Sequence, residues 1–301
     1  MANLASTRVA PSTPQLGAAL QLLKPVTWFP PMWAFGCGVV SSGLSIADHW
    51  GLLLAGMALS GPLVCGTSQA VNDWFDRHVD AINEPNRPIP SGRVPGRWGL
   101  YIAIAWTVLS LAVAAALGSV VFWAAVFGMA MAWAYSAPPF RLKANGWWGN
   151  AAVGLCYEGL PWFTGAAVLL AAVPGLPVIV LALLYSLGAH GIMTLNDFKS
   201  IGGDSKMGVR SLPVQLGVAG AARTACAVMA LPQVIVIGLL FMWGKPMHAA
   251  AIIALLAVQL VMMRRFMVNP VARALWYSGL GVPLYVSGML VSAFALRGLG
   301  A

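Results

Sequence analysis

The chain has 301 residues, of which 59% are hydrophobic and 8% are charged, and its mean hydropathy is +0.80. Soluble domains carry about 25% charged residues, so this composition excludes an ordinary soluble fold and indicates a membrane protein. The net charge of +9 would suit nucleic-acid binding, but the basic residues lie between long apolar segments, an arrangement typical of membrane orientation signals.

Residues 1–23 contain one Arg and no continuous apolar core. We therefore expect a cytoplasmic N-terminal tail rather than a signal or transit peptide, followed by a single transmembrane domain over residues 24–301.

Nearly all of this domain divides into apolar segments of about 20 residues, the length that spans a bilayer as a helix. The apolar runs are too long for barrel strands, so we predict an all-α, polytopic fold of about nine transmembrane helices. The predicted spans are Trp28–Ile46, Leu52–Val71, Trp98–Leu117, Val120–Ala137, Trp147–Ala171, Leu176–Leu195, Val218–Phe241, Met247–Met267 and Leu275–Leu296.

The basic residues predict the orientation of these spans. With the N-terminus in the cytoplasm, every Lys and Arg except Lys245 and Arg297 falls on the cytoplasmic side. This bias matches the positive-inside rule, so we predict a cytoplasmic N-terminus and a periplasmic C-terminus.

The first acidic segment, Asn72–Asp80, directly continues the second predicted span. Residues four apart lie on one face of a helix, so Asn72, Asp76 and Asp80 would present oxygen atoms in one direction. Hard cations such as Mg²⁺ take oxygen ligands and typically use one or two carboxylates plus substrate phosphates. The spacing favours a metal site over the alternative, a solvated helix end.

After the fourth predicted span, a Pro pair ends the helix and the loop presents Arg141 and Lys143 at the same surface. Positive-inside charge explains these two residues equally well.

The second acidic segment follows the sixth predicted span and contains Asp197 and Asp204. These residues are seven apart and would share one helical face, but the intervening Gly202-Gly203 favours a flexible turn. Two acidic segments on one membrane face, each with nearby bases, suit a diphosphate held by metal ions.

These motifs resemble the UbiA superfamily of intramembrane prenyltransferases. The NDxxDxxxD motif of that family appears as Asn72, Asp73, Asp76 and Asp80, and its YSxPPxxLK loop appears as Tyr135–Lys143. The resemblance covers essentially the whole chain. It implies nine helices around a central cavity that opens to the cytoplasm and laterally to lipid.

Within the superfamily, segments such as Lys24–Phe35, Leu160–Trp162 and Asn196–Lys199 resemble the bacteriochlorophyll and chlorophyll synthases. That branch attaches a C20 prenyl group, geranylgeranyl or phytyl, to the propionate of a (bacterio)chlorophyllide. Where the branch usually has an acidic residue before Gly-Asp and a basic residue after it, this chain has Gly202 and Ser205, which makes the second cluster one carboxylate poorer.

The resemblance implies a Mg²⁺-dependent enzyme of (bacterio)chlorophyll biosynthesis in a bacterial cytoplasmic or intracytoplasmic photosynthetic membrane. Asp73 is then a further metal ligand or an orienting residue beside Asn72, Asp76, Asp80, Asp197 and Asp204. The candidates for diphosphate binding are Arg87, Tyr135, Ser136, Lys143, Lys199, Lys206 and Arg210.

The acceptor is expected in an apolar, aromatic-lined part of the cavity, with Trp28 and Trp162 as candidates. The alternative for each Trp is a place in the interfacial belt, where Trp is enriched without any ligand. Glu158 lies inside the fifth span and either lines this cavity or hydrogen-bonds a neighbouring helix. His190, inside the sixth span, either ligates the tetrapyrrole Mg or hydrogen-bonds a neighbouring helix.

Two rival functions stay open from the sequence. A sister prenyltransferase acting on a quinone precursor or haem would share the metal and diphosphate motifs. A membrane transporter would place its carboxylates near the midplane, whereas six of the eight acids here lie at one membrane face.

Overall fold

The computed structural model describes residues 13–297 and 299, and within these residues all regular elements are helices. In chain order they are α1 (Leu16–Leu22), η1 (Pro25–Thr27), α2 (Phe29–Ser41), α3 (Trp50–Ala58), η2 (Leu59–Cys65), α4 (Gly66–Asn83), α5 (Trp98–Ala116), α6 (Ser119–Ser136), η3 (Leu142–Ala144), α7 (Gly146–Gly154), η4 (Leu155–Gly159), α8 (Leu160–Leu170), α9 (Leu176–Asp197), α10 (Ile201–Lys206), α11 (Leu212–Met242), α12 (Pro246–Val268) and α13 (Pro270–Leu296). The predicted all-α fold is confirmed.

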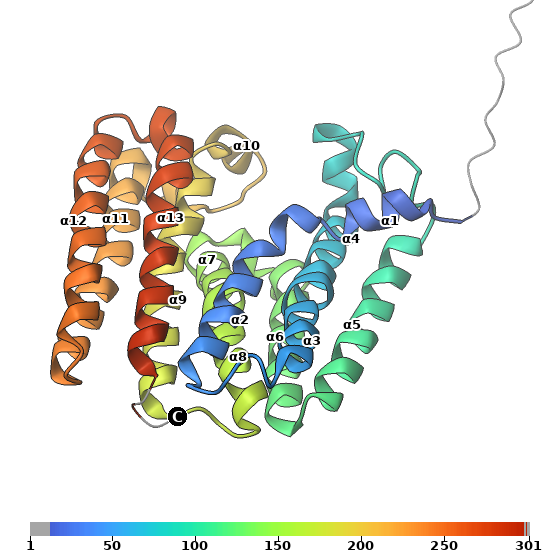
Figure 1. Cartoon of the computed structure of the whole chain (residues 1–301). Helices are drawn as coiled ribbons and strands as arrows, with labels where there is room; N and C mark the ends of the chain where they lie inside the picture. The colour runs from blue at the N-terminus through green and yellow to red at the C-terminus, as the bar shows by residue number, and fades with distance from the viewer. Residues whose placement is uncertain (1–12, 298, 300–301) are drawn as a thin grey trace, which may run out of the picture.

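The helices form one bundle (Figure 1). The long helices run roughly side by side, with α11, α12 and α13 at one edge and α5 at the other. α1 lies across the end of the bundle that also carries α10, whereas the C-terminal end of α13 lies at the opposite end. The second half of the predicted tail is therefore a helix packed on the domain, with Leu22 and Leu23 buried beside Val71. Residues 1–12 lie outside the described part.

Within the described part, eight helices are long and apolar enough to cross a membrane. Their bounds follow the predicted spans closely, and the second span runs on without interruption through α3, η2 and α4 (Trp50–Asn83). The seventh was predicted to begin at Val218. Its helix α11 begins at Leu212 but is broken at Gly217, whose φ of 68° is left-handed, so the straight part does start where hydropathy placed it.

The first predicted span is shorter than expected. α2 has 13 residues, about 20 Å at the rise of an α-helix, whereas a hydrocarbon core is about 30 Å thick. It ends at Ser41, with Ser42 as the C-cap, because Gly43 adopts a positive φ of 75°, a common helix stop. α2 packs against α8 and α13.

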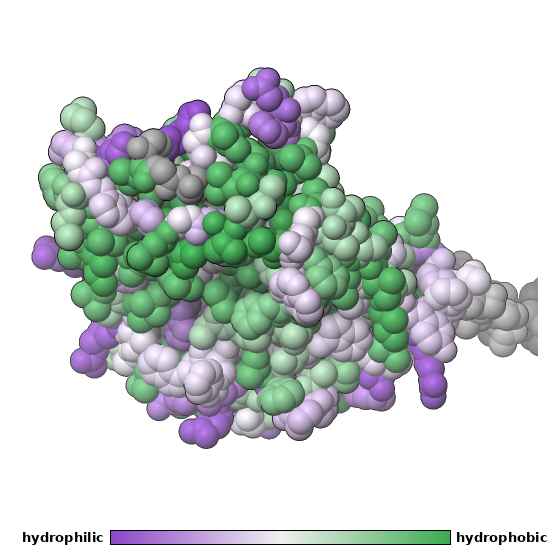
Figure 2. All heavy atoms as spheres, turned by 90° about the horizontal axis from the view of Figure 1, so that it is seen from below, coloured by the Kyte–Doolittle hydropathy of each residue, from purple (hydrophilic) through white to green (hydrophobic). Residues whose placement is uncertain are grey.

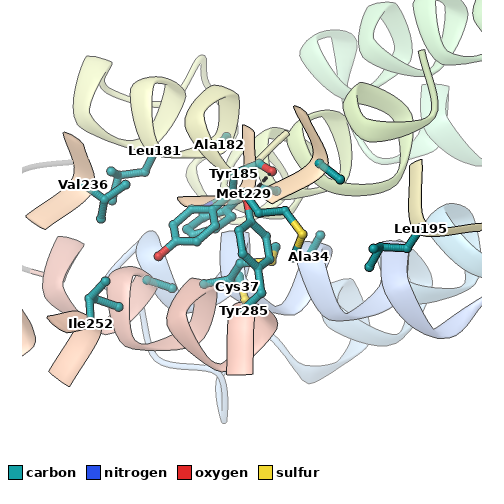
Figure 3. Close-up of a cluster of buried hydrophobic side chains, with 14 of the residues drawn as sticks. Ala34, Cys37, Leu181, Ala182, Tyr185, Leu195, Met229, Val236, Ile252 and Tyr285 are labelled. Atoms are coloured by element: carbon teal, nitrogen blue, oxygen red, sulfur yellow. Dashed lines mark hydrogen bonds between the residues drawn. The ribbon is translucent and has the colours of Figure 1, made fainter. Parts of the chain in front are cut away.

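The largest core lies among α2, α8, α9, α11, α12 and α13. Tyr185 is at its centre, stacked on Trp162 with ring centroids 5.6 Å apart and edge-on to Tyr285 at 5.4 Å. The Tyr285 hydroxyl donates to the backbone oxygen of Tyr185 at 2.8 Å. Figure 3 shows both tyrosines together with Cys37 and Met229 between the helices. The hydroxyls of Tyr185 and Tyr285 are both hydrogen-bonded, and their buried rings pack this half of the bundle tightly.

The two ends of the bundle differ in polarity. Figure 2 views the end opposite α10, where apolar side chains cover most of the surface and strongly hydrophilic ones lie at its rim. The acidic segments and most Arg and Lys residues are at the other end. The asymmetry agrees with the charge bias along the sequence.

Candidate active site

A cavity of about 810 Å³ lies in the bundle, lined by η1, α2, η2, α4, α6, α7, η4, α9 and α13. Its wall is mostly apolar, as expected of a site that receives hydrocarbon. The larger polar side chains on the wall are Gln69, Asn72, Tyr135, Tyr157, Glu158 and Asn196.

Both acidic segments reach this cavity through an asparagine. Asn72 lines it from α4, and Asn196, beside Asp197, lines it from the last turn of α9. The Asn72 amide donates to the Ser136 hydroxyl at 3.2 Å, which joins α4 to the end of α6. The acidic end of the bundle is thus the polar end of the cavity.

Asp73 and Asp80 are buried on α4 and share one guanidinium. The Arg87 Nη1 atom lies 3.4 Å from Asp73 Oδ1 and 2.9 Å from Asp80 Oδ2, and its other edge holds Glu84 at 2.7 Å. Hydrogen bonding from Arg87 lowers the pKa of the Glu84 carboxyl, and despite burial the three carboxylates raise the pKa of Arg87. Arg87, predicted to bind diphosphate, here fastens the 84–97 loop to α4.

The two carboxylate oxygens of Asp73 have different surroundings. Its Oδ1 atom accepts from Lys24 at 2.7 Å, while Oδ2 is buried without a hydrogen-bond partner. The salt bridge ties the segment before α2 to α4, which is the geometry of an orienting residue.

Asp76 pairs with the loop between α6 and α7. Its Oδ2 atom lies 2.6 Å from Lys143 Nζ, and its Oδ1 atom lies 3.9 Å from Arg141. Burial lowers the pKa of the Lys143 ammonium, and the neighbouring Asp76 carboxylate opposes that shift. Both residues of the predicted basic loop therefore face the first acidic segment.

The second acidic segment is more ordered than predicted. α10 (Ile201–Lys206) is helical through Gly202 and Gly203, and the Ser200 hydroxyl, next to its start, donates to Asp204 at 2.8 Å. Asp197 accepts from the Asn150 amide of α7 at 3.1 Å. The predicted flexible turn is wrong, because the side chain of Ser200 holds the first turn in place.

Two loops meet at this end of the bundle. Tyr135, in the last turn of α6, lines the cavity together with Asn72 and Asn196, one from each acidic segment. The backbone of Arg210 exchanges hydrogen bonds with Ala144 and Gly146 at 2.9 and 2.8 Å. The fold therefore brings the 137–145 and 207–211 loops together beside the acidic segments.

Three predicted diphosphate residues have their charged ends in solvent. Lys199, Lys206 and Arg210 are exposed around α10, and within the described residues no side-chain ion pair holds them. Their charged groups are therefore accessible to an anion from solvent.

Three of the four predicted acceptor residues do not line the cavity. Trp162 has no exposed surface, and its indole N–H donates to Ser41 in the core, so its position does not support contact with a substrate. Trp28 donates to the backbone oxygen of Leu23 and is not on the cavity wall. His190 packs against Trp147 behind the wall formed by Ala189 and Met193, a position that does not suit an axial ligand to a macrocycle in the cavity.

Glu158 is the one of these four acceptor candidates that lines the cavity. The structure also adds wall residues that the sequence reading missed, above all Gln69, whose amide donates to the Tyr157 hydroxyl at 2.9 Å. Gln69 is a polar residue inside the apolar second span, three positions before Asn72, and this placement was the sequence feature that could have identified it.

The six predicted ligands are Asn and Asp side chains, whose oxygen atoms are the ligand type that Mg²⁺ prefers. Within residues 13–297 and 299, no three His, Cys, Asp or Glu side chains are close enough together to hold a metal ion. The predicted carboxylate ligands therefore do not complete a metal site by themselves, and cations bound here would take their remaining ligands from a diphosphate.

Residues 27–295 match the UbiA prenyltransferase family. The chain belongs to this family. This UbiA prenyltransferase is 61% identical over 288 residues to the bacteriochlorophyll synthase 33 kDa chain of Cereibacter sphaeroides, covering 96% of this chain and 95% of that protein. It is 58% identical over 290 residues to the corresponding chain of Rhodobacter capsulatus, covering 95% of each. The chloroplastic chlorophyll synthase of Arabidopsis thaliana is 40% identical over 291 residues, covering 92% of this chain and 73% of that protein.

Solved structures share the fold. A digeranylgeranylglyceryl phosphate synthase structure has a TM-score of 0.73 at 20% identity, covering 93% of this chain and 98% of that one. A UbiA homolog from Archaeoglobus fulgidus bound to GPP and Mg²⁺ has a TM-score of 0.62 at 21% identity, covering 93% and 99%. The prediction of a UbiA-type intramembrane prenyltransferase is confirmed.

Proposed function

We propose that this enzyme transfers a C20 prenyl group, geranylgeranyl or phytyl, from its diphosphate to the propionate carboxylate of bacteriochlorophyllide. The bacteriochlorophyll synthase chains that are 61% and 58% identical support this acceptor over a quinone precursor or haem. The observation that carries the proposal is the cavity, which is apolar within the bundle and reaches the two acidic segments at one end.

The reaction joins one propionate oxygen to the allylic carbon of the prenyl group. The bond from that carbon to the diphosphate oxygen breaks, and the electron pair leaves with the diphosphate. A propionate has an unperturbed pKa near ~4, so it is ionised at neutral pH and needs no strong general base. Catalysis then consists of orienting the two substrates and stabilising the leaving diphosphate.

The residues at the polar end supply that stabilisation. Asn72, Asp76 and Asp80 from α4, and Asp197 and Asp204 around α10, would hold Mg²⁺, which neutralises negative charge on the diphosphate when bound. Lys143 pairs with Asp76, and the exposed Lys199, Lys206 and Arg210 would bind the remaining diphosphate oxygens.

Purified protein incubated with Mg²⁺, geranylgeranyl diphosphate and either bacteriochlorophyllide or 4-hydroxybenzoate tests the proposal. We expect a product with the mass of the bacteriochlorophyllide ester and no prenylated benzoate, with activity lost when EDTA removes the metal. Prenylation of 4-hydroxybenzoate alone would contradict the proposal and favour the quinone pathway. Uptake of a solute into vesicles without any product would favour a transporter.

The orientation leads to a second prediction. We propose that the end carrying α10 and the acidic segments faces the cytoplasm of a bacterial cytoplasmic or intracytoplasmic membrane. After the four cysteines have been replaced, Ser91→Cys at that end should react with an impermeant thiol reagent only from the cytoplasm. Asp48→Cys at the opposite end is the matched control and should react only from the periplasm. Reaction of Ser91→Cys from the periplasm would reverse the orientation.

A further inference from the structure

A carboxyl group without a partner lies on the cavity wall. Glu158 is only 4% exposed, yet it belongs to the cavity lining. Its Oε2 atom is buried without a hydrogen-bond partner, and within the described residues no hydrogen bond or ion pair involves this side chain. The alternative raised by the sequence, a carboxyl hydrogen-bonded to a neighbouring helix, is therefore not what the structure contains.

The backbone around Glu158 is unusual. It belongs to η4 (Leu155–Gly159), a π-helical turn between α7 and α8, and a second π-helical turn, η2 (Leu59–Cys65), lies on the wall of the same cavity. Such turns insert one residue into an α-helix and are frequent at functional sites, since they turn a chosen side chain out of the regular helical rows.

The neighbouring Tyr157 shows what a satisfied polar group looks like on this wall. Its hydroxyl accepts from Gln69 at 2.9 Å and lies 3.3 Å from the Cys65 thiol. Glu158 has no such arrangement. Burying an unpaired carboxyl in apolar surroundings is unfavourable, so a ligand that pairs with it gains an interaction that the empty cavity does not provide.

The two substrates differ in what they offer this carboxyl. A prenyl chain is hydrocarbon and has no hydrogen-bonding atom, so placing it against Glu158 would leave the carboxyl unpaired. A tetrapyrrole carries carbonyl groups on its periphery, each a hydrogen-bond acceptor. A neutral carboxylic acid has one O–H donor, which matches a carbonyl oxygen.

We propose that Glu158 donates a hydrogen bond to a peripheral carbonyl of the tetrapyrrole and so determines where the acceptor binds and which macrocycles are accepted. This inference rests on the proposed function. A site built to hydrogen-bond a substrate group discriminates strongly against analogues that lack it, because its own polar group then stays unpaired. Glu158 is thus a specificity-determining residue, while the chemistry occurs at the polar end of the cavity.

The test compares Glu158→Leu with wild type in two measurements. Titration of bacteriochlorophyllide without prenyl diphosphate gives the Kd, and initial rates give a KM for each substrate. We expect Glu158→Leu to raise the Kd and KM for the tetrapyrrole about tenfold, equivalent to about 1.4 kcal/mol, and to leave the KM for the diphosphate unchanged. Glu158→Gln keeps a donor and should give a smaller increase.

The control is Asp48→Asn. Asp48 is an exposed carboxyl that does not line the cavity, so its loss should change neither constant.

Resonance Raman spectra of the bound pigment report the hydrogen bond directly. One carbonyl stretching band should lie at lower frequency in wild type than in Glu158→Leu. Identical carbonyl bands, an unchanged Kd, or equal changes in both KM values would each overturn the proposal. A changed coordination band of the macrocycle Mg with unshifted carbonyls would assign Glu158 to that metal instead. Failure of the proposed function has a different signature, the absence of esterified product from wild type.

Discussion

Replacing Asp76 with asparagine is expected to lower kcat for prenyl transfer by at least about 100-fold, the usual cost of removing one group that stabilises a developing anion. The change removes a charge and one metal-binding oxygen but keeps the size of the side chain. The amide oxygen of the Asp76→Asn variant would still accept a hydrogen bond from Lys143, so the loop between α6 and α7 should stay in place. We therefore expect the protein to remain folded, with a melting temperature close to that of wild type.

The measurement is the initial rate as a function of Mg²⁺ concentration, with Asp48→Asn as the control. Asp48 is an exposed carboxylate at the opposite end of the bundle, and its loss should leave the rate unchanged. If Asp76 binds metal, the Mg²⁺ concentration for half-maximal activity should also rise in Asp76→Asn. A wild-type rate and Mg²⁺ dependence in Asp76→Asn would remove Asp76 from the metal site.

Most of the fold was predictable because lipid restricts the backbone so strongly. Long apolar runs have to be helices, and the change to polar sequence marks where each one leaves the membrane. The predictions of helix bounds and turns failed at two places where local interactions determine the backbone conformation. α2 stops early at Gly43, and α10 is helical despite two glycines because the Ser200 hydroxyl binds Asp204. Hydropathy contains neither signal.

The sequence predicted which residue types form the site better than it predicted which side chains contact one another. The regular spacing of Asn72, Asp76 and Asp80 places them on one face of α4, but it does not show that Arg87 bridges Asp80 to Asp73. Pairings between distant segments depend on how the loops fold back.

Aromatic residues were the least predictable part of the site. Trp162 and Trp33 both lie in apolar helices, yet Trp162 is in the core and Trp33 is on the cavity wall. The difference follows from the rotation of each helix about its axis. Composition and hydropathy do not fix that rotation.

Gly165→Ala is expected to destabilise the protein by about 3 kcal/mol, the upper end of the usual cost of overpacking, because α2 and α8 touch backbone to backbone. A Cβ atom on Gly165 would lie 2.1 Å from the backbone oxygen of Phe35, and one on Gly38 would lie 2.0 Å from that of Trp162. Backbone atoms cannot move aside as a flexible side chain can. Small residues at such crossings allow membrane helices to approach closely.

The matched control is Gly238→Ala in α11, where an added Cβ meets nothing within 4 Å. Both variants replace a helical glycine in a span, so any difference in melting temperature and in the yield of monodisperse protein reports the α2–α8 contact. α2 also carries Phe29, Pro30 and Trp33 on the cavity wall, so protein that does fold with α2 displaced should bind bacteriochlorophyllide more weakly. A melting temperature for Gly165→Ala equal to that of Gly238→Ala would show that the two backbones are not in contact, and the short α2 would then need another anchor against the bundle.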